Sequence, residues 1–356
     1  MKSISALALV VSATIPLSGW AIGTVDLANY QLIGRHALPE PTRVTSPADS
    51  LLAQEASAVT WNRDTNTLFV VGDGGTSVVQ VGLTGSLVDS MTLALDANKP
   101  QGTAYYDPEG LTYVGGGKFI VVEERDRVVS QFSYAPGTTL GYADSQHVKL
   151  GTSIGNIGIE GISHDPLTGG IIAVKETGPM GVFQTDLDFA AGTASNGSAT
   201  TVNSVNLFDP NVKLAGIVTD IADVYALSNL DGIGAGELGN LLLLSQESGK
   251  VIEVDRSGNV LSTLTIPFLP NNPLGSTVLD GPGGPLSVAN QQHEGLTMDD
   301  AGFLYLVSEN GGGDINNPQL WVFAPAPVPE PGTYALMLAG LAALGAGVRR
   351  RNRNRA

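Results

Sequence analysis

The sequence predicts an all-β protein, a β-propeller with five blades (six are also possible) of four antiparallel strands each. Three observations predict it. A motif of acidic and small residues recurs five times along the chain. Each copy leads into apolar runs separated by turn-forming residues, and no long amphipathic helical pattern interrupts them. Repeated groups of four short strands are typical of propeller blades.

The five copies share one layout, in which the motif leads into a first strand, and a turn and a second apolar strand follow. The motifs begin at Glu55, Asp107, Glu160, Asp220 and Glu294. The second strands end on polar or acidic residues, which are Asp73, Glu124, Glu176, Gln246 and Glu309. Turn formers such as residues 115–117 separate the two strands, which favours hairpins. A sixth blade would have to lie within residues 180–290, where long loops rich in Gly, Asn, Pro and Ser are expected.

The fifth copy lacks a fourth strand before the chain end. An unassigned strand-like run, residues 30–38, lies near the amino end of the body. We expect this run to complete the last blade and so to close the ring.

The repeat predicts that acidic side chains gather at one mouth of the central channel. In an antiparallel hairpin the start of the first strand and the end of the second lie together. The first strand of a propeller blade is the innermost one, so both positions face the channel. The candidate metal ligands are Glu109, Glu160, Glu294, Asp73, Glu124, Glu176, Glu309, Glu55 and Asp220.

So many carboxylates around one cavity favour a bound cation. Like charges at close range raise each other's pKa values, and a divalent cation relieves that repulsion. Carboxylate oxygens suit Ca²⁺, whereas no Cys or His cluster has zinc spacing. The chain has no EF-hand loop, so a calcium site would be assembled from several blades. The alternative is that these acids cap turns, accept hydrogen bonds from backbone N–H groups and stay hydrated.

Residues 1–21 have the layout of a secretory signal peptide. Lys2 precedes an apolar run over residues 4–15, and small residues at Gly19 and Ala21 predict cleavage after Ala21. This pattern predicts export of the body, residues 22–325.

Residues 327–356 have the layout of a sorting tail. Pro329, Glu330 and Pro331 precede an apolar stretch over residues 334–348, and five Arg residues follow. The stretch is short for a membrane-spanning helix, and the Arg cluster would hold its end on the cytoplasmic side. This arrangement resembles the PEP-CTERM sorting signal of Gram-negative bacteria. The resemblance implies a transient anchor in the inner membrane, processing by an exosortase, and final placement at the cell surface or in the extracellular matrix.

The acidity of the body excludes one class of partner. The whole chain has a formal net charge of -16. Without both ends, the net charge of the body is about −21, because the tail holds many of the basic residues. Nucleic-acid binding needs a basic face, so it is not expected. Contact with a membrane is expected only through the tail.

The motifs of the body also resemble the SdiA-regulated family of bacterial propellers. They include D-P-E-G-L at residues 107–111, I-E-G-I-S-H-D-P at 159–166 and H-E-G-L-T-M-D at 293–299. The resemblance covers about residues 30–323 and implies a propeller with a calcium-type site at its acidic mouth. Ser57, Ala222 and Gln246 stand where other copies carry acids. These departures favour an off-centre site over a symmetric one.

The sequence therefore supports a calcium-binding module at the cell surface or in the matrix, with a polysaccharide or a small molecule as its ligand. One alternative is a metal-dependent hydrolase of ester or phosphoester bonds, similar to phytase-like and lactonase-like propellers, in which the metal activates water. That alternative is a fold-level analogy. A purely structural matrix protein is the third hypothesis.

Overall fold

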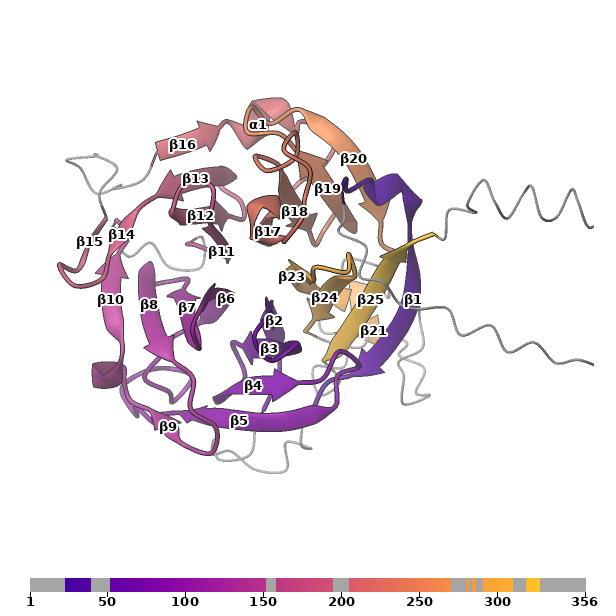
Figure 1. Ribbon diagram of the computed structural model, residues 1–356. Coiled ribbons are helices and arrows are strands. Elements are labelled where there is room, and N and C mark those ends of the chain that lie inside the picture. The colour runs from indigo at the N-terminus through magenta and orange to yellow at the C-terminus, as the bar shows by residue number, and fades with distance from the viewer. Residues whose placement is uncertain are drawn as a thin grey trace, which may run out of the picture.

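In the computed structural model, five β-sheets stand around a central channel (Figure 1). The structure describes residues 23–39, 52–151, 158–194, 205–269, 280–281, 284–285, 291–309 and 318–326. The predicted signal peptide, residues 1–21, and the predicted tail, residues 327–356, lie outside them. Within the described ranges, no helix has the length and apolar character needed to cross a membrane.

Each sheet forms one blade of four antiparallel strands, which run outward from the channel. Blade one contains β2 (Ala56–Asn62), β3 (Thr67–Gly72), β4 (Ser77–Val81) and β5 (Leu87–Leu93), with the short β9 (Thr139–Leu140) added in parallel to β5. Blade two contains β6 (Pro108–Gly115), β7 (Lys118–Glu123), β8 (Val128–Ser133) and β10 (Gln146–Lys149). Blade three contains β11 (Gly161–Asp165), β12 (Gly170–Lys175), β13 (Gly181–Thr185) and β16 (Val205–Phe208).

The remaining strands form two blades and two small ribbons. Blade four contains β17 (Asp223–Ala226), β18 (Leu241–Ser245), β19 (Lys250–Val254) and β20 (Val260–Thr265), and blade five contains β23 (His293–Met298), β24 (Leu304–Ser308), β25 (Gln319–Pro325) and β1 (Tyr30–Ala37). The ribbons are β14 (Leu187–Asp188) with β15 (Thr193–Ala194), and β21 (Asp280–Gly281) with β22 (Gly284–Pro285). Helices are short: α1 (Pro210–Lys213), η1 (Leu27–Asn29), η2 (Tyr142–Asp144) and η3 (Leu227–Asn229). The five-bladed all-β fold predicted from the sequence is confirmed.

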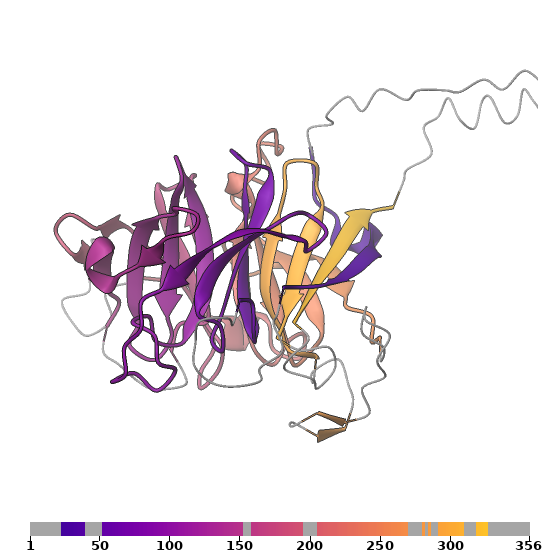
Figure 2. The same ribbon diagram turned by 90° about the horizontal axis from the view of Figure 1, so that it is seen from below.

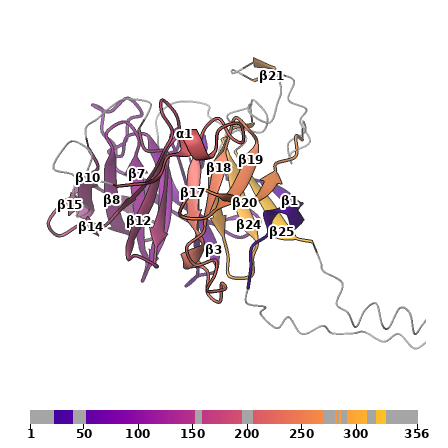
Figure 3. The ribbon, with the colours of Figure 1, turned by 90° about the horizontal axis from the view of Figure 1, so that it is seen from above.

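The first strand of the body closes the ring, as its position in the sequence predicts. β1 pairs antiparallel with β25, so that Tyr30 lies opposite Pro325 and Ala37 opposite Gln319. Figures 2 and 3 show the two strands side by side at the outer edge of the disc. Blade five is thus built from both ends of the body, and its hydrogen bonds hold the ring together.

A separate apolar core fills each of the five interfaces between neighbouring blades. Alternate residues of one strand point to opposite sides, so Leu68 and Val70 of β3 pack toward blade five while Phe69 and Val71 pack toward blade two. The same alternation on β18 divides four consecutive leucines between two cores. Because both faces of these strands are buried, their sequences are continuously apolar rather than alternating.

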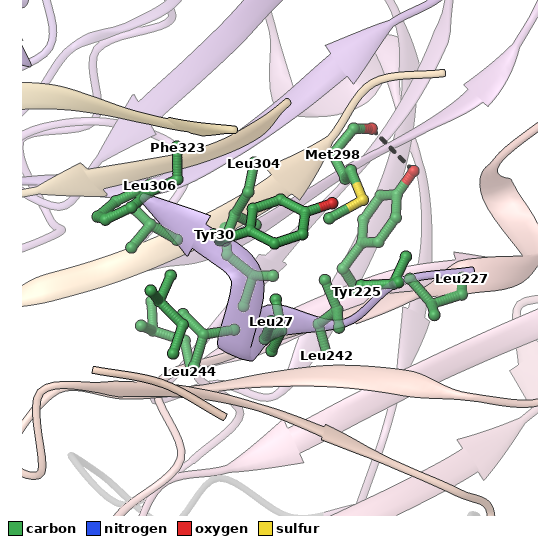
Figure 4. Close-up of a cluster of buried hydrophobic side chains, with 14 of the residues drawn as sticks. Leu27, Tyr30, Tyr225, Leu227, Leu242, Leu244, Met298, Leu304, Leu306 and Phe323 are labelled. Atoms are coloured by element: carbon green, nitrogen blue, oxygen red, sulfur yellow. Dashed lines mark hydrogen bonds between the residues drawn. The ribbon is translucent and has the colours of Figure 1, made fainter. Parts of the chain in front are cut away.

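Figure 4 shows the core between blades four and five. Leu242 and Leu244 of β18 meet Leu304 and Leu306 of β24, and residues of η1 and β1 cover them. The hydroxyl group of Tyr225 donates a hydrogen bond of 3.0 Å to the carbonyl oxygen of Met298 across the interface. The amino end of the body is therefore part of this core as well as of the sheet.

The inner strands are joined around the channel by side-chain acceptors. In each pair of neighbouring blades, one side-chain oxygen accepts a hydrogen bond from a backbone N–H group of the other blade. The bonds run from Tyr113 to Thr60 (3.0 Å), His164 to Thr112 (2.9 Å), Ala226 to Ser163 (3.0 Å), Leu296 to Asp223 (2.8 Å) and Trp61 to Thr297 (3.1 Å). Blade four carries Tyr225 where the others have Thr or Ser, and Asp223 supplies the acceptor instead.

Glycine is needed where these strands approach one another most closely. A Cβ atom on Gly295 would lie 2.8 Å from both the Cα atom of Ala58 and the backbone nitrogen of Val59. A Cβ atom on Gly161 would lie 2.5 Å from the Cα atom of Asp223. The Glu-Gly pairs of the repeat thus combine an acid for the channel with a glycine for the contact between blades.

Loss of one interblade acceptor is expected to weaken the whole ring. The Thr112→Val substitution leaves the backbone N–H group of His164 without its acceptor, and an unsatisfied buried donor costs about 1–3 kcal/mol. We expect the free energy of unfolding, measured by urea titration, to fall by that amount. Thr112→Ser keeps the hydroxyl group and is the matched control. Equal losses in the two variants would contradict this role of the hydroxyl group.

Candidate metal centre

A β-bulge at the start of every inner strand sets the first ring of residues at the channel. In blades one, two and five the strand register shifts by one residue, at Ser57, Glu109 and Glu294. In blade three, the backbone N–H group of Glu160 donates to Val174, the residue that lies opposite Gly161. In blade four, the backbone N–H group of Ala222 donates to Leu244, which lies opposite Asp223. A bulge turns the side chain of its extra residue, here toward the end of the channel where the inner strands begin. We call this end the mouth and the opposite end the far face.

The second ring consists of the residues that directly follow the second strand of each blade. They are Asp73, Glu124, Glu176, Gln246 and Glu309. The antiparallel pairing brings them back to the mouth, as the sequence predicts. Side chains of both rings enclose a cavity of about 310 Å³, which is lined by Asp73, Asp107, Glu109, Glu124, Arg125, Glu160, Glu176, Gln246, Gln292, Glu294 and Glu309.

Two further lining residues come from a strained position just before the bulge. The residue two positions ahead of the bulge residue has a left-handed backbone in three blades: Glu55 (φ 49°), Asp107 (φ 58°) and Gln292 (φ 50°). Such φ values are uncommon for residues other than glycine and are often found at functional sites. Asp107 and Gln292 line the cavity.

Three carboxylates on blades one and two are close enough to share one ion. Asp73, Asp107 and Glu109 each offer one oxygen atom, and these atoms all lie within 4.8 Å of one another. Calcium binds its oxygen ligands at about 2.3–2.6 Å, so ligands on opposite sides of one ion are about 5 Å apart. The three residues therefore fit part of a calcium coordination shell.

The carboxyl groups of the cavity are held away from water and near one another. Burial, and then the neighbouring Glu124, raises the pKa of Glu160 to about 10. Burial and the charges of Glu55 and Asp107 raise the pKa of Asp73 to about 7. Burial also raises the pKa of Glu124 to about 7, with a hydrogen bond to Asp107 as the next cause.

The same causes act on the other acids of the two rings. Burial and the charges of Asp73 and Glu160 raise the pKa of Glu109 well above its usual value. The pKa values of Glu294 and Glu309 are also raised well above the usual value, mainly by burial and then by neighbouring carboxylates. A raised pKa favours the protonated form of each of these groups when no cation is bound.

Arg125 is the one basic side chain among the described residues that line the cavity. Its Nε atom donates a hydrogen bond to Asp107, and it lies 3.9 Å from the carboxylate of Glu124. Its guanidinium carbon lies 5.6 Å from the centre of the Tyr106 ring. One guanidinium group cannot neutralise eight ionised carboxyl groups, so full ionisation of the site needs a cation to balance the negative charge.

Two of the predicted ligands do not line the cavity. Asp220 accepts hydrogen bonds from Ser245 and from the backbone N–H groups of Gln246 (2.8 Å) and Glu247 (3.2 Å), so it caps the turn after β18. The carboxylate of Glu55 lies against Gly74, where a Cβ atom would be 1.9 Å from it. The other seven predicted ligands line the cavity. The lining also includes four residues that were not among the nine predicted ligands: Asp107, Gln246, Gln292 and Arg125.

The histidines near the motifs do not contribute to the cavity lining. His293 is fully buried against Trp321, with ring centres 4.8 Å apart, and burial lowers its pKa to about 3. His164 lies deeper in the blade, opposite Ile171. Apart from Arg125, every described lining residue offers a side-chain oxygen atom, which favours a hard cation over zinc.

Comparison with known proteins identifies two matching families. The SdiA-regulated family model matches residues 43–311, and the PEP-CTERM protein-sorting motif matches residues 327–351. The latter implies export and sorting by an exosortase.

Similar solved structures include several propellers. Glutaminyl cyclase of Myxococcus xanthus is 12% identical, with a TM-score of 0.46 over 82% of this chain and 95% of that chain. A luciferin-regenerating enzyme is 11% identical, with a TM-score of 0.41 over 77% and 92%. Virginiamycin B lyase of Staphylococcus aureus is 11% identical, with a TM-score of 0.36 over 79% and 68%. None of these likenesses bears on function.

The raised pKa values predict an unusual dependence of stability on pH. Between about pH 4.5 and 7, folded Asp73, Glu124 and Glu160 keep protons that the unfolded chain releases. The free energy of unfolding therefore falls as the pH rises through this range. In a chelating buffer we expect a lower melting temperature at pH 7.5 than at pH 5.

The control for this prediction is the Glu160→Gln variant, in which a neutral amide replaces one of the carboxyl groups whose pKa is raised. Its melting temperature should change less between the two pH values. A melting temperature of the unmodified protein that rises with pH in the chelator would contradict the prediction.

Proposed function

This chain belongs to the SdiA-regulated family, and we propose that it is a calcium-binding module that acts outside the cell. The PEP-CTERM motif implies export, and calcium outside cells is plentiful enough to fill a site of modest affinity. The observation that carries the proposal is the group Asp73, Asp107 and Glu109, whose oxygens lie within 4.8 Å of one another. The ion would also relieve the repulsion among the remaining acids of the two rings.

The bound ion would create the surface to which a ligand binds. A cavity of about 310 Å³ leaves room beside an ion for part of a polysaccharide or for a small molecule. Hydroxyl and carboxylate oxygens of such a ligand would complete the coordination shell, since calcium takes about 6–8 oxygen ligands. After processing of the tail, the protein would present this site at the cell surface or in the extracellular matrix.

Calcium is expected to stabilise the protein by mass action. With a Kd of about 10⁻⁴ M, which is typical of extracellular calcium modules, about 10 mM Ca²⁺ would add about 2.7 kcal/mol to the free energy of unfolding. We expect a higher melting temperature in Ca²⁺ than in a chelator. Glu109→Gln should abolish the difference, because it removes one of the three clustered carboxylates.

The matched control is Glu247→Gln, which removes an exposed acid close to the mouth that does not line the cavity. It should keep the full response to calcium. If the purified protein shows no shift in Ca²⁺, or if both variants respond alike, the calcium site is not where we place it.

A hydrolase would use the same ion to activate a water molecule, so catalysis has its own test. For a binding module we expect no turnover when phosphoesters and lactones are screened with calcium-loaded protein. Turnover that is lost in Glu160→Gln, a lining residue, would replace the binding module with a metal-dependent hydrolase. Absence of any bound polymer or small molecule, together with calcium-dependent stability, would favour a structural matrix protein.

A further inference from the structure

The two ends of the body leave the propeller on the face opposite the acidic mouth. β24 runs toward the mouth, where Glu309 follows it, and β25 starts there because Gln319 lies opposite Ser308. β25 therefore runs away from the mouth and ends at Pro325 on the far face. The backbone N–H group of Ala326 then donates to the carbonyl oxygen of Asn29 (2.7 Å), which holds the exit point in place.

The amino end of the body lies on the same far face. Gly234 donates a backbone hydrogen bond of 2.9 Å to Gly23, and the backbone N–H group of Val25 donates to Glu237 (2.7 Å). Gly234 and Glu237 belong to the connection between the far end of β17 and the start of β18. Figure 2 shows the end of β25 and the start of β1 together at one edge of the disc.

We propose that, while the tail is in the membrane, the acidic mouth faces away from that membrane and toward the surroundings. Seven residues, 327–333, separate Ala326 from the apolar stretch of the tail. Fully extended, they reach at most about 25 Å. The seven residues of β25 rise by about 23 Å between the two faces.

That comparison decides between the two orientations. To bring the mouth against the bilayer, the connecting residues would have to be fully extended back along the whole length of β25. With the far face toward the bilayer, the same residues need no such reversal. The eight carboxyl groups at the mouth also add a repulsion from anionic lipid headgroups. The partner that fits the mouth is thus a molecule of the surroundings, dissolved or part of the matrix, and not a lipid of the anchoring membrane.

This orientation rests on the proposed insertion of the tail and is independent of calcium. Its test uses the absence of cysteine from the chain, because one introduced cysteine takes one fluorescent label. Leu167→Cys places the label on the far face, in the turn between β11 and β12, and Thr177→Cys places it at the mouth, just after β12. Both positions are exposed and flank the same strand, so lateral position is matched.

The full-length chain, with its tail intact, is reconstituted into liposomes that contain lipid labelled with an acceptor dye. Energy transfer from the protein to the lipid dye should be greater for the label at position 167 than for the label at position 177. A second pair, Ala235→Cys on the far face and Glu247→Cys at the mouth, should show the same order on blade four.

Each result has a distinct meaning. Equal transfer from both positions, or greater transfer from the mouth, contradicts the orientation while leaving the anchor intact. A chain that does not float with the liposomes overturns the insertion on which the orientation rests. Neither result bears on calcium binding, which the melting experiments test separately.

Discussion

The close approach of five inner strands around one channel is the constraint on which the rest of the structure depends. Four consecutive residues of blade two show how it is met. Glu109 is the extra residue of the bulge and points into the mouth, and Gly110 leaves space for the neighbouring strand. Leu111 enters the core between blades one and two, and Thr112 accepts the hydrogen bond from blade three. The acids of the mouth are therefore inseparable from the packing of the ring.

Much of the fold could be predicted because the signals are local or repeated. Runs such as residues 241–244 and the turns beside them mark strands whose two faces are both buried. The closing role of β1 follows from counting strands, since the last copy lacks one. The sequence pattern could not show which residue of each motif accepts the hydrogen bond between blades. Thr112 and Thr297 look like ordinary strand residues until the blades are placed together.

The sequence predicted which strand ends meet at the mouth, but not which acidic side chains there line the cavity. Asp107 and Glu55 occupy the same position in their repeats, yet only Asp107 lines the cavity. Asp107 is held there by Arg125 and by Gln101, whose side-chain amide donates to it at 2.7 Å, whereas the carboxylate of Glu55 lies against Gly74. The contact with Gln101, six residues away, does not recur in the described parts of the other repeats, so no repeated sequence pattern marks it. The departures at Ser57 and Ala222 were visible, and they agree with a triad drawn from two neighbouring blades.

The pairing of β1 with β25 also determines when the ring can close. β1 belongs to the first residues of the body and β25 to the last, and β25 is the only strand with which β1 pairs among the described residues. When a chain is exported amino end first, β1 crosses the membrane early and stays unpaired until β25, the last strand of the body, has crossed as well. The mouth is completed only at that moment, on the outer side of the membrane. The carboxyl groups that line the cavity thus come together only after export, and the same sequence has no finished cavity in the cytoplasm.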